Sequence, residues 1–225
     1  MFTIDVFSDL ICPWCYIGGR RLKRAVDIVE GRTGAEFRIH YRAFELNPAM
    51  PLAGMDRRAY RSAKFGSWER SRQLDQGTVL AGRGEGTAFD YEKITRTPNT
   101  RAGHRLIALA QREAGLGAVM ADRLFAAYFA EGRDIGDPAV LARLGEDDGL
   151  AVGVAQRLDD PALERAVRAD EEIAEQLGLR GVPLFILGER AINGAVEVER
   201  LIEALERRAT RPQAGAVCDE GACSQ

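Results

Sequence analysis

The chain has 225 residues, of which 46% are hydrophobic and 29% are charged, and its formal net charge at pH 7 is -3. These proportions are typical of a globular protein with enough apolar material for a core, and the slight negative charge gives no reason to expect nucleic acid or an anionic membrane surface as a partner. No apolar run reaches the roughly 18 residues that indicate a membrane-spanning helix, so none is expected.

The first part of the chain predicts a strand, a helix and a second strand. Apolar and polar residues alternate in Phe2–Phe7 and again in Glu36–Arg42, and the intervening stretch, Pro13–Glu30, carries apolar residues at helical spacing. A connection of this length implies that the two strands pair in parallel through a right-handed crossover. Because Met1 leads almost directly into the first strand, without a basic and apolar leader segment, the expected compartment is the cytoplasm.

The middle of the chain, residues 47–158, shows helical patterns separated by glycines and no convincing strand. Asp137-Pro138 is typical of a helix start, because the aspartate can cap the helix and the proline suits its first position. The glycine-rich stretch 82–86 follows no strand and lacks the full spacing of a phosphate-binding loop, so we interpret it as a mobile connection between helices. The expected helices are Asp56–Phe65, Ser67–Leu80, Thr100–Ala114, Val119–Ala130 and Pro138–Glu146.

The last part of the chain returns to a mixed pattern. Asp160-Pro161 is a second such helix start, and it precedes a helix over Ala162–Leu177. The run 179–187 then predicts a strand with Pro183 at its first position, and a tight turn, a short return strand and a closing helix over Glu197–Ala209 follow. This order predicts an α/β fold, with the strands of one domain interrupted by an all-helical insertion. The expected division is a discontinuous domain, residues 1–46 and 159–209, an insertion domain, residues 47–158, and a mobile tail, residues 210–225.

Two of the four cysteines, Cys12 and Cys15, flank Pro13 and Trp14 at the point where the first strand gives way to the first helix. Pro13 suits the first turn of a helix, since its φ is fixed and it has no N–H to donate. Cys12 is therefore expected at the helix N-terminus, where free N–H groups and the helix dipole favour a thiolate, with Cys15 about one turn further along the same face. The arrangement predicts a redox pair in which Cys12 is the nucleophile and Cys15 resolves the mixed disulfide.

A C-x-x-C pair can also be half of a zinc site, or two ordinary buried thiols. The strand before it and the proline that opens the helix favour the redox interpretation. One alternative is a four-thiolate metal site, which would combine Cys12 and Cys15 with Cys218 and Cys223, because both spacings permit it. A second alternative is an interaction module, which would turn over no disulfide substrate.

Several segments together resemble a known family. The chain is similar to the DsbA-like branch of the thioredoxin fold, and in particular to its FrnE subgroup, over about residues 2–208; the segments that carry the resemblance are Ser8–Cys15, Phe44–Pro48, Asn99–Leu106 and Gly181–Pro183. Gly103 stands where the resemblance leads us to expect alanine or serine.

The resemblance implies a thiol–disulfide oxidoreductase or isomerase that needs no cofactor. Its implied partners are protein thiols and disulfides, with glutathione as a further candidate. A glutathione-dependent isomerase or transferase of the same group is the alternative function, although such proteins carry a lone serine where this chain has Cys12.

The resemblance also implies that the Val182–Pro183 peptide bond is cis and lies beside the cysteine pair. A cis-proline turn would expose the Val182 backbone, which could then bind an extended substrate segment in the manner of a strand. The alternative is a trans proline that only begins a strand.

Weaker expectations concern residues near these segments. Phe44 and Asn47 are expected to line a substrate groove, or otherwise to pack the seam between the two domains. Trp14 is expected either to contact substrate or to pack against the insertion. Asp9 is expected to orient the active-site turn or to pass protons, or to be an ordinary turn residue. For His104, a hydrogen-bonding role is favoured over a catalytic one.

The tail carries the second cysteine pair, Cys218 and Cys223. Four residues separate the two cysteines, and Gly221 lets the chain turn back, so an internal disulfide is feasible. The hypothesis is a second redox pair that exchanges electrons with Cys12 and Cys15, or a redox-sensitive gate over the groove. The alternative is a disordered end with incidental thiols.

Overall fold

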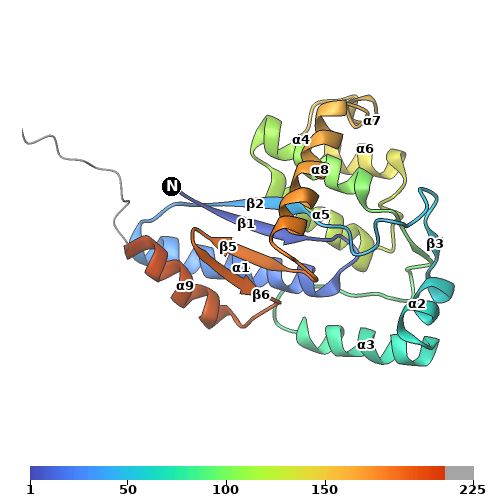
Figure 1. Cartoon of the computed structure of the whole chain (residues 1–225), viewed down its shortest axis with the longest axis horizontal. Coiled ribbons are helices and arrows are strands. Elements are labelled where there is room, and N and C mark those ends of the chain that lie inside the picture. Colours follow the sequence, from blue (N-terminus) through green and yellow to red (C-terminus); the bar gives the residue numbers. More distant parts are fainter. Residues whose placement is uncertain (211–225) are drawn as a thin grey trace, which may run out of the picture.

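The computed structural model describes residues 1–210. Its main sheet contains β1 (Phe2–Ser8), β2 (Phe37–Ala43), β5 (Leu184–Leu187) and β6 (Arg190–Asn193), in the spatial order β2-β1-β5-β6 (Figure 1). β1 and β2 pair in parallel along their whole length, as predicted from the helical crossover between them. β5 runs antiparallel to β1, and β6 runs antiparallel to β5.

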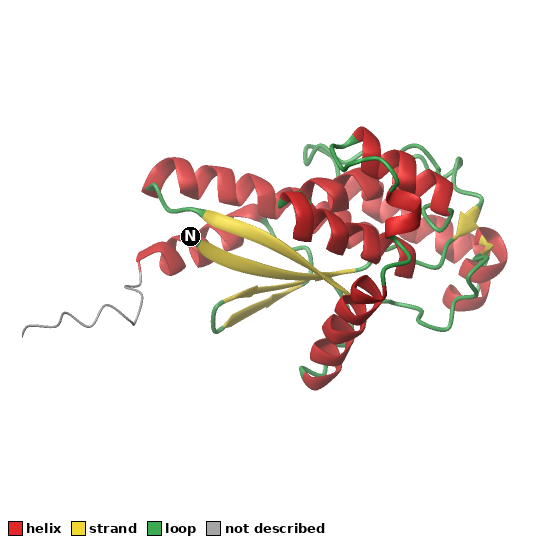
Figure 2. Ribbon diagram, turned by 90° about the horizontal axis from the view of Figure 1, so that it is seen from above, coloured by secondary structure: helices red, strands yellow, loops and turns green. Residues whose placement is uncertain are grey.

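Helices cover both faces of this sheet. α1 (Pro13–Thr33) and α9 (Val198–Thr210) pack together on one face, and α8 (Pro161–Gln176) lies on the other (Figure 2). β1 is consequently buried on both faces at its C-terminal end: Val6 belongs to the core that includes α1, whereas Phe7 packs against α8. The expected α/β fold is confirmed, with the end of β1 held between two helical layers.

The other helices gather beyond the end of the sheet at which α1 begins (Figure 1). The first turn of α1 reaches into this group, because the Tyr16 ring stacks on Phe125 and Phe129 with centroid separations of 5.4 and 6.0 Å. Such aromatic pairs add to the energy of burial. The helices of the group are α2 (Arg57–Phe65), α3 (Trp68–Ala81), α4 (Arg101–Ala114), α5 (Gly117–Phe129), α6 (Pro138–Asp147) and α7 (Val154–Arg157).

The predicted helix starts at aspartate–proline pairs are confirmed. The side chains of Asp137 and Asp160 accept hydrogen bonds from the N–H groups of Ala139 and Ala162, each at 2.8 Å. These bonds satisfy donors that have no partner inside the helix.

The expectation that residues 47–158 contain no strand is wrong. β3 (Met55–Asp56) and β4 (Arg96–Thr97) form a short antiparallel pair there. Two residues are too few to show an alternating pattern, so the pairing could not be read from the sequence. The single turn α7 was missed for the same reason. The strand predicted over 179–187 begins only at Leu184, after the proline.

The two parts of the chain share a core. α8 packs on β2 and also on α4, and one apolar cluster extends from β1 through α4 and α5 to α9. The boundary at residue 158, and with it the division into 1–46 with 159–209 and 47–158, stays a prediction. Within residues 1–210 no helix combines the length and apolarity needed to cross a membrane. Cys218 and Cys223 lie outside the described residues.

A buried arginine, Arg21, connects three distant segments. Its Nε donates to Glu85 in the 82–86 loop at 2.8 Å, and its Nη1 donates to the Ala195 carbonyl, just before α9, at 2.8 Å. The side chains of Arg21 and Glu85 are both buried. Ion pairs from Glu85 therefore connect the 82–86 loop to α1. The second of them is with Arg24, at 3.2 Å.

We predict that Arg21→Ala lowers the free energy of unfolding by about 3 kcal/mol, because it leaves a buried carboxylate with half of its partners and a buried carbonyl without its donor. The matched control is Lys23→Ala on the same helix, where the exposed ion pair with Asp27 is expected to contribute about 0.5 kcal/mol or less. Urea denaturation of both variants tests this. Equal losses in the two variants would contradict the structural role of Arg21.

Candidate active site

Cys12 is the residue that caps the N-terminus of α1. Its φ and ψ are -93° and 110°, which is extended backbone, and Pro13 follows at the first helical position. The Cys12 carbonyl accepts the N–H of Cys15 at 3.0 Å, while its own N–H donates to the Asp9 carbonyl at 3.0 Å. Cys12 therefore stands at the N-terminus of α1, as predicted, and its side chain makes no capping hydrogen bond there.

Cys15 lies deeper than Cys12, with 2% of its surface exposed against 6% for Cys12. Both are free thiols in this structure. Burial and the neighbouring Cys12 raise the pKa of Cys15 well above that of an ordinary thiol, and the Asp9 backbone and the Ser8 side chain oppose this only in part. The two thiols thus differ in the way that a nucleophile and a resolving thiol must differ.

The Val182–Pro183 peptide bond is cis, which confirms the expectation from the resemblance. The Cys12 sulfur donates to the Val182 carbonyl at 3.7 Å, so two segments 170 residues apart meet at the reactive sulfur. Residues 177–194 surround a hollow of about 560 Å³ that Val182 and Pro183 line. The backbone beside Cys12 therefore borders open space in which an extended chain could lie.

The remaining predicted residues are arranged less closely around the sulfur. Phe44 is half-buried in the small cluster under α8 that also contains Val182, and its N–H donates to Ser8 at 3.1 Å. Asn47 is half-buried, and its carbonyl accepts the N–H of Met50 at 3.0 Å. Neither residue lines the hollow around 177–194. Trp14 is 43% exposed, which leaves it accessible to a substrate.

Asp9 has a larger structural role than its place in a turn indicates. The carboxylate is fully buried; its Oδ2 accepts the N–H of Leu46 at 2.7 Å, and its Oδ1 faces His104 Nε2 at 3.6 Å. A Cβ at position 103 would meet the Leu10 side chain at 2.5 Å, so Gly103 lets α4 approach the active-site turn closely. The departure at Gly103 is thereby explained, because a larger residue would push against Leu10.

The Asp9–His104 contact was not predicted, because it joins segments 95 residues apart. Asp9 Oδ1 and His104 Nε2 have no hydrogen-bond partner in the described part of the chain, since 3.6 Å is too long for a hydrogen bond between them. Two buried polar atoms that face each other in this way could share a bridging water molecule. The sequence signal was the occurrence of both residues within the segments that carry the resemblance.

A second polar cluster next to this turn was also missed. Arg101 contacts Glu45 at 2.7 Å, Glu164 at 3.1 Å and Glu171 at 3.3 Å. Burial and the neighbouring Glu45 raise the pKa of Glu171 to about 7, although Arg101 opposes the shift. The cluster joins the segment after β2 to α4 and α8.

Among residues 1–210, no group of three or more histidine, cysteine, aspartate or glutamate side chains is arranged to hold a metal ion. The four-thiolate alternative needs Cys218 and Cys223, which lie outside the described residues, so it stays untested.

The geometry can be compared with known proteins. Residues 3–206 match the DSBA-like thioredoxin domain family. The chain belongs to this family. A similar solved structure is a probable DsbA oxidoreductase from Streptomyces coelicolor, with a TM-score of 0.83 and 30% identity over 100% of this chain and 97% of that one. The uncharacterized protein YwbO of Bacillus subtilis is 26% identical over 194 residues, which are 85% of this chain and 90% of YwbO.

More distant structures share the fold. The cytosolic disulfide reductase DsbM of Pseudomonas aeruginosa, solved with GSH, has a TM-score of 0.63 and 22% identity over 92% of this chain and 96% of DsbM. A 2-hydroxychromene-2-carboxylate isomerase has a TM-score of 0.66 and 18% identity over 91% of this chain and 95% of the isomerase. The fold is therefore shared by a protein described as a disulfide reductase and one described as an isomerase, so the fold alone does not decide the reaction.

The difference between the two thiols predicts selective alkylation. In the native, reduced protein at about pH 8, near the pKa of an ordinary thiol, iodoacetamide should modify Cys12 well before Cys15, because the thiolate is the reactive form and burial raises the pKa of Cys15. Peptide mass spectrometry over time measures both sites. In denaturant the two rates should converge, and equal rates in the native protein would contradict the assignment.

Proposed function

We propose that this protein is a thiol–disulfide oxidoreductase of protein cysteines, with Cys12 as the nucleophile and Cys15 as the resolving thiol. The observation that carries the proposal is the position of the Cys12 sulfur, at the α1 N-terminus and 3.7 Å from the Val182 carbonyl. The family supports the class of reaction. The presence of a thiol at position 12 favours disulfide chemistry over the isomerase or transferase alternative.

The reaction follows from the two thiols. The Cys12 thiolate attacks one sulfur of a substrate disulfide; a Cys12–substrate disulfide forms and the second substrate sulfur leaves as a thiolate. Cys15 then loses its proton and attacks the Cys12 sulfur, which releases the remaining substrate thiol and leaves a Cys12–Cys15 disulfide. Two electrons have passed to the substrate. Two molecules of a monothiol such as glutathione then restore the reduced pair and leave joined as their own disulfide. In the opposite direction, a substrate dithiol reduces the Cys12–Cys15 disulfide.

Three structural features support this chemistry. Pro13 fixes the start of α1, Val182 and Pro183 present a backbone edge beside the sulfur, and the hollow around 177–194 offers room for an extended substrate. The proposal also includes three substrate contacts, Trp14, Phe44 and Asn47. The exposure of Trp14 supports its role. Phe44 and Asn47 do not line the hollow around 177–194.

We further propose membership of the FrnE subgroup, a cytoplasmic location and glutathione as a physiological reductant. The subgroup rests on the Ser8–Cys15, Phe44–Pro48 and Gly181–Pro183 segments. The similarity to a cytosolic disulfide reductase solved with GSH supports the location and the reductant.

The assignment of the two thiols predicts opposite results for two variants. Cys15→Ser should accumulate mixed disulfides with protein substrates through Cys12, because the resolving thiol is gone, and a reducing agent should release them. Cys12→Ser should trap nothing and reduce insulin about 100-fold more slowly or worse, since no activated thiolate remains. Gel mobility under non-reducing conditions and an insulin-reduction assay measure these effects. Normal turnover by Cys12→Ser would refute the proposal.

The tail pair, Cys218 and Cys223, is proposed as a second redox pair that exchanges with Cys12 and Cys15. Replacing both tail cysteines with serine should slow the regeneration of the reduced active-site pair while leaving single-turnover attack by Cys12 unchanged. Stopped-flow kinetics and disulfide mapping after mild oxidation test this. Unchanged kinetics, with no Cys218–Cys223 or tail-to-active-site disulfide at any redox poise, would leave the tail without this role.

A further inference from the structure

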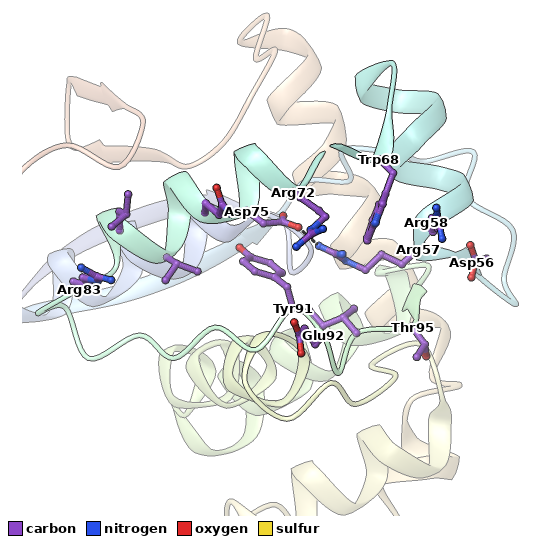
Figure 3. Close-up of a pocket in the computed structure, with 14 residues that line it drawn as sticks. Asp56, Arg57, Arg58, Trp68, Arg72, Asp75, Arg83, Tyr91, Glu92 and Thr95 are labelled. Atoms are coloured by element: carbon purple, nitrogen blue, oxygen red, sulfur yellow. Dashed lines mark hydrogen bonds and ion pairs between the residues drawn. The ribbon is translucent and has the colours of Figure 1, made fainter. Parts of the chain in front are cut away.

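A pocket of about 620 Å³ lies between α2, α3 and the segment 91–95, away from the residues proposed for disulfide chemistry (Figure 3). Its lining comes entirely from residues 56–95, so Cys12, Cys15 and the 181–183 turn do not contribute to it. The volume falls within the range of about 300–1,000 Å³ that is usual for small-molecule sites.

The spacing of residues along α3 explains why the pocket forms. Trp68, Arg72, Asp75 and Val79 recur at intervals of three and four residues, so they lie on one face of the helix. That face combines an aromatic ring, a cation, a carboxylate and an aliphatic side chain. Figure 3 shows it turned toward Arg57 of α2 and Tyr91.

The floor of the pocket is held rigidly. Arg57, only 3% exposed, contacts Asp75 at 2.7 Å, and its guanidinium lies 5.4 Å from the Trp68 ring and 5.1 Å from the Tyr91 ring. The Tyr91 hydroxyl and the Thr78 hydroxyl are 2.6 Å apart. A buried charge with an ion-pair partner and two aromatic contacts has few other positions available. The site is therefore formed before any ligand arrives.

The charge of the pocket is positive although the whole chain is acidic. Four arginines and three carboxylates line it, and Asp75 is shared by Arg57 and by Arg61 behind the floor, both at 2.7 Å. The single charge of Asp75 therefore stands opposite two guanidinium groups. Asp56 is occupied as the cap of α2, leaving Glu92 as the other acidic group at the edge.

Three of the lining arginines, Arg58, Arg72 and Arg83, are exposed, and their side chains make no ion pair or hydrogen bond with the described residues. The Arg58 guanidinium lies 5.9 Å from the centre of the Trp68 ring. Arg72 projects toward the middle of the pocket and Arg83 lies at one end (Figure 3). Guanidinium groups that are free in this way can bind an oxyanion through two hydrogen bonds.

The pocket also offers apolar surface. Leu80 is 58% exposed on its wall, and Val79, Ile94 and the Trp68 and Tyr91 rings provide further apolar atoms. An inorganic anion would leave this surface in contact with water, and a neutral apolar molecule would leave the arginines unused.

We propose that this pocket is a binding site for a small organic anion with an apolar body, of the size of a two-ring aryl sulfonate or carboxylate. The oxyanion would bind Arg72, and the apolar body would lie on the ring of Trp68 or Tyr91. The proposal does not depend on the disulfide chemistry, because the two sites share no residue.

The test compares naphthalene-2-sulfonate with naphthalene-2-sulfonamide, which has the same rings and no charge at neutral pH. Calorimetry on the full reduced chain should show one saturable site for the sulfonate and binding about tenfold or more weaker for the sulfonamide. Trp14→Phe leaves Trp68 as the only tryptophan, since the chain has two, so a ligand-dependent change in its emission locates the site.

Variants identify the residues. The double variant Arg72→Gln with Arg83→Gln should weaken the sulfonate about tenfold or more and leave the sulfonamide unchanged, while Arg38→Gln, an exposed charge on β2, should change neither. Insulin reduction should be unaffected in the double variant, so the failure of one proposal is separable from that of the other. The proposal is overturned by absence of saturable sulfonate binding, by equal affinity for the two ligands, by an unchanged Trp68 emission, or by a double variant that binds the sulfonate as tightly as the native chain.

Discussion

The buried carboxylate of Asp9 is the constraint around which the active site is built. Asp9 lies fully buried in the turn between β1 and α1. Its main-chain carbonyl accepts a hydrogen bond from the N–H of Cys12, and its side chain accepts one from the N–H of Leu46. An ionised carboxylate in such a place is costly unless its oxygens are paired. The facing His104 of α4 gives it a second polar neighbour, and so the turn, the segment after β2 and the insertion come together at Cys12.

Arginine side chains also join separate segments elsewhere in the molecule. Arg21 joins α1 to the 82–86 loop and to the start of α9, Arg101 joins α4 to Glu45 and α8, and Arg57 joins α2 to α3. Each makes contacts to segments far away in the chain, which a guanidinium can do because its donors point in several directions. The helical insertion is thus fixed relative to the sheet by directional polar contacts as well as by the shared apolar core.

The two candidate sites suit a negative charge in different ways. At Cys12 the feature that suits a negative sulfur is the N-terminus of α1. In the 56–95 pocket, arginines without partners face solvent beside apolar side chains, which suits a negative charge that arrives from outside. Although the chain has a net charge of -3, both proposals place a negative group beside locally positive protein, a thiolate at the first site and a ligand oxyanion at the second.

Local patterns were enough to predict the strand–helix–strand order, the position of Cys12 at the start of α1 and the helical insertion. They also predicted the helix caps at Asp137 and Asp160. Each of these features depends on residues within one strand or one helical turn. Resemblance to a family supplied the cis bond before Pro183. The pairing of β3 with β4, the Asp9–His104 contact and the pocket lined from α2, α3 and the 91–95 segment arose only when the elements packed. No spacing along the chain encodes them, since they depend on which distant side chains the folded core brings within a few ångströms of each other.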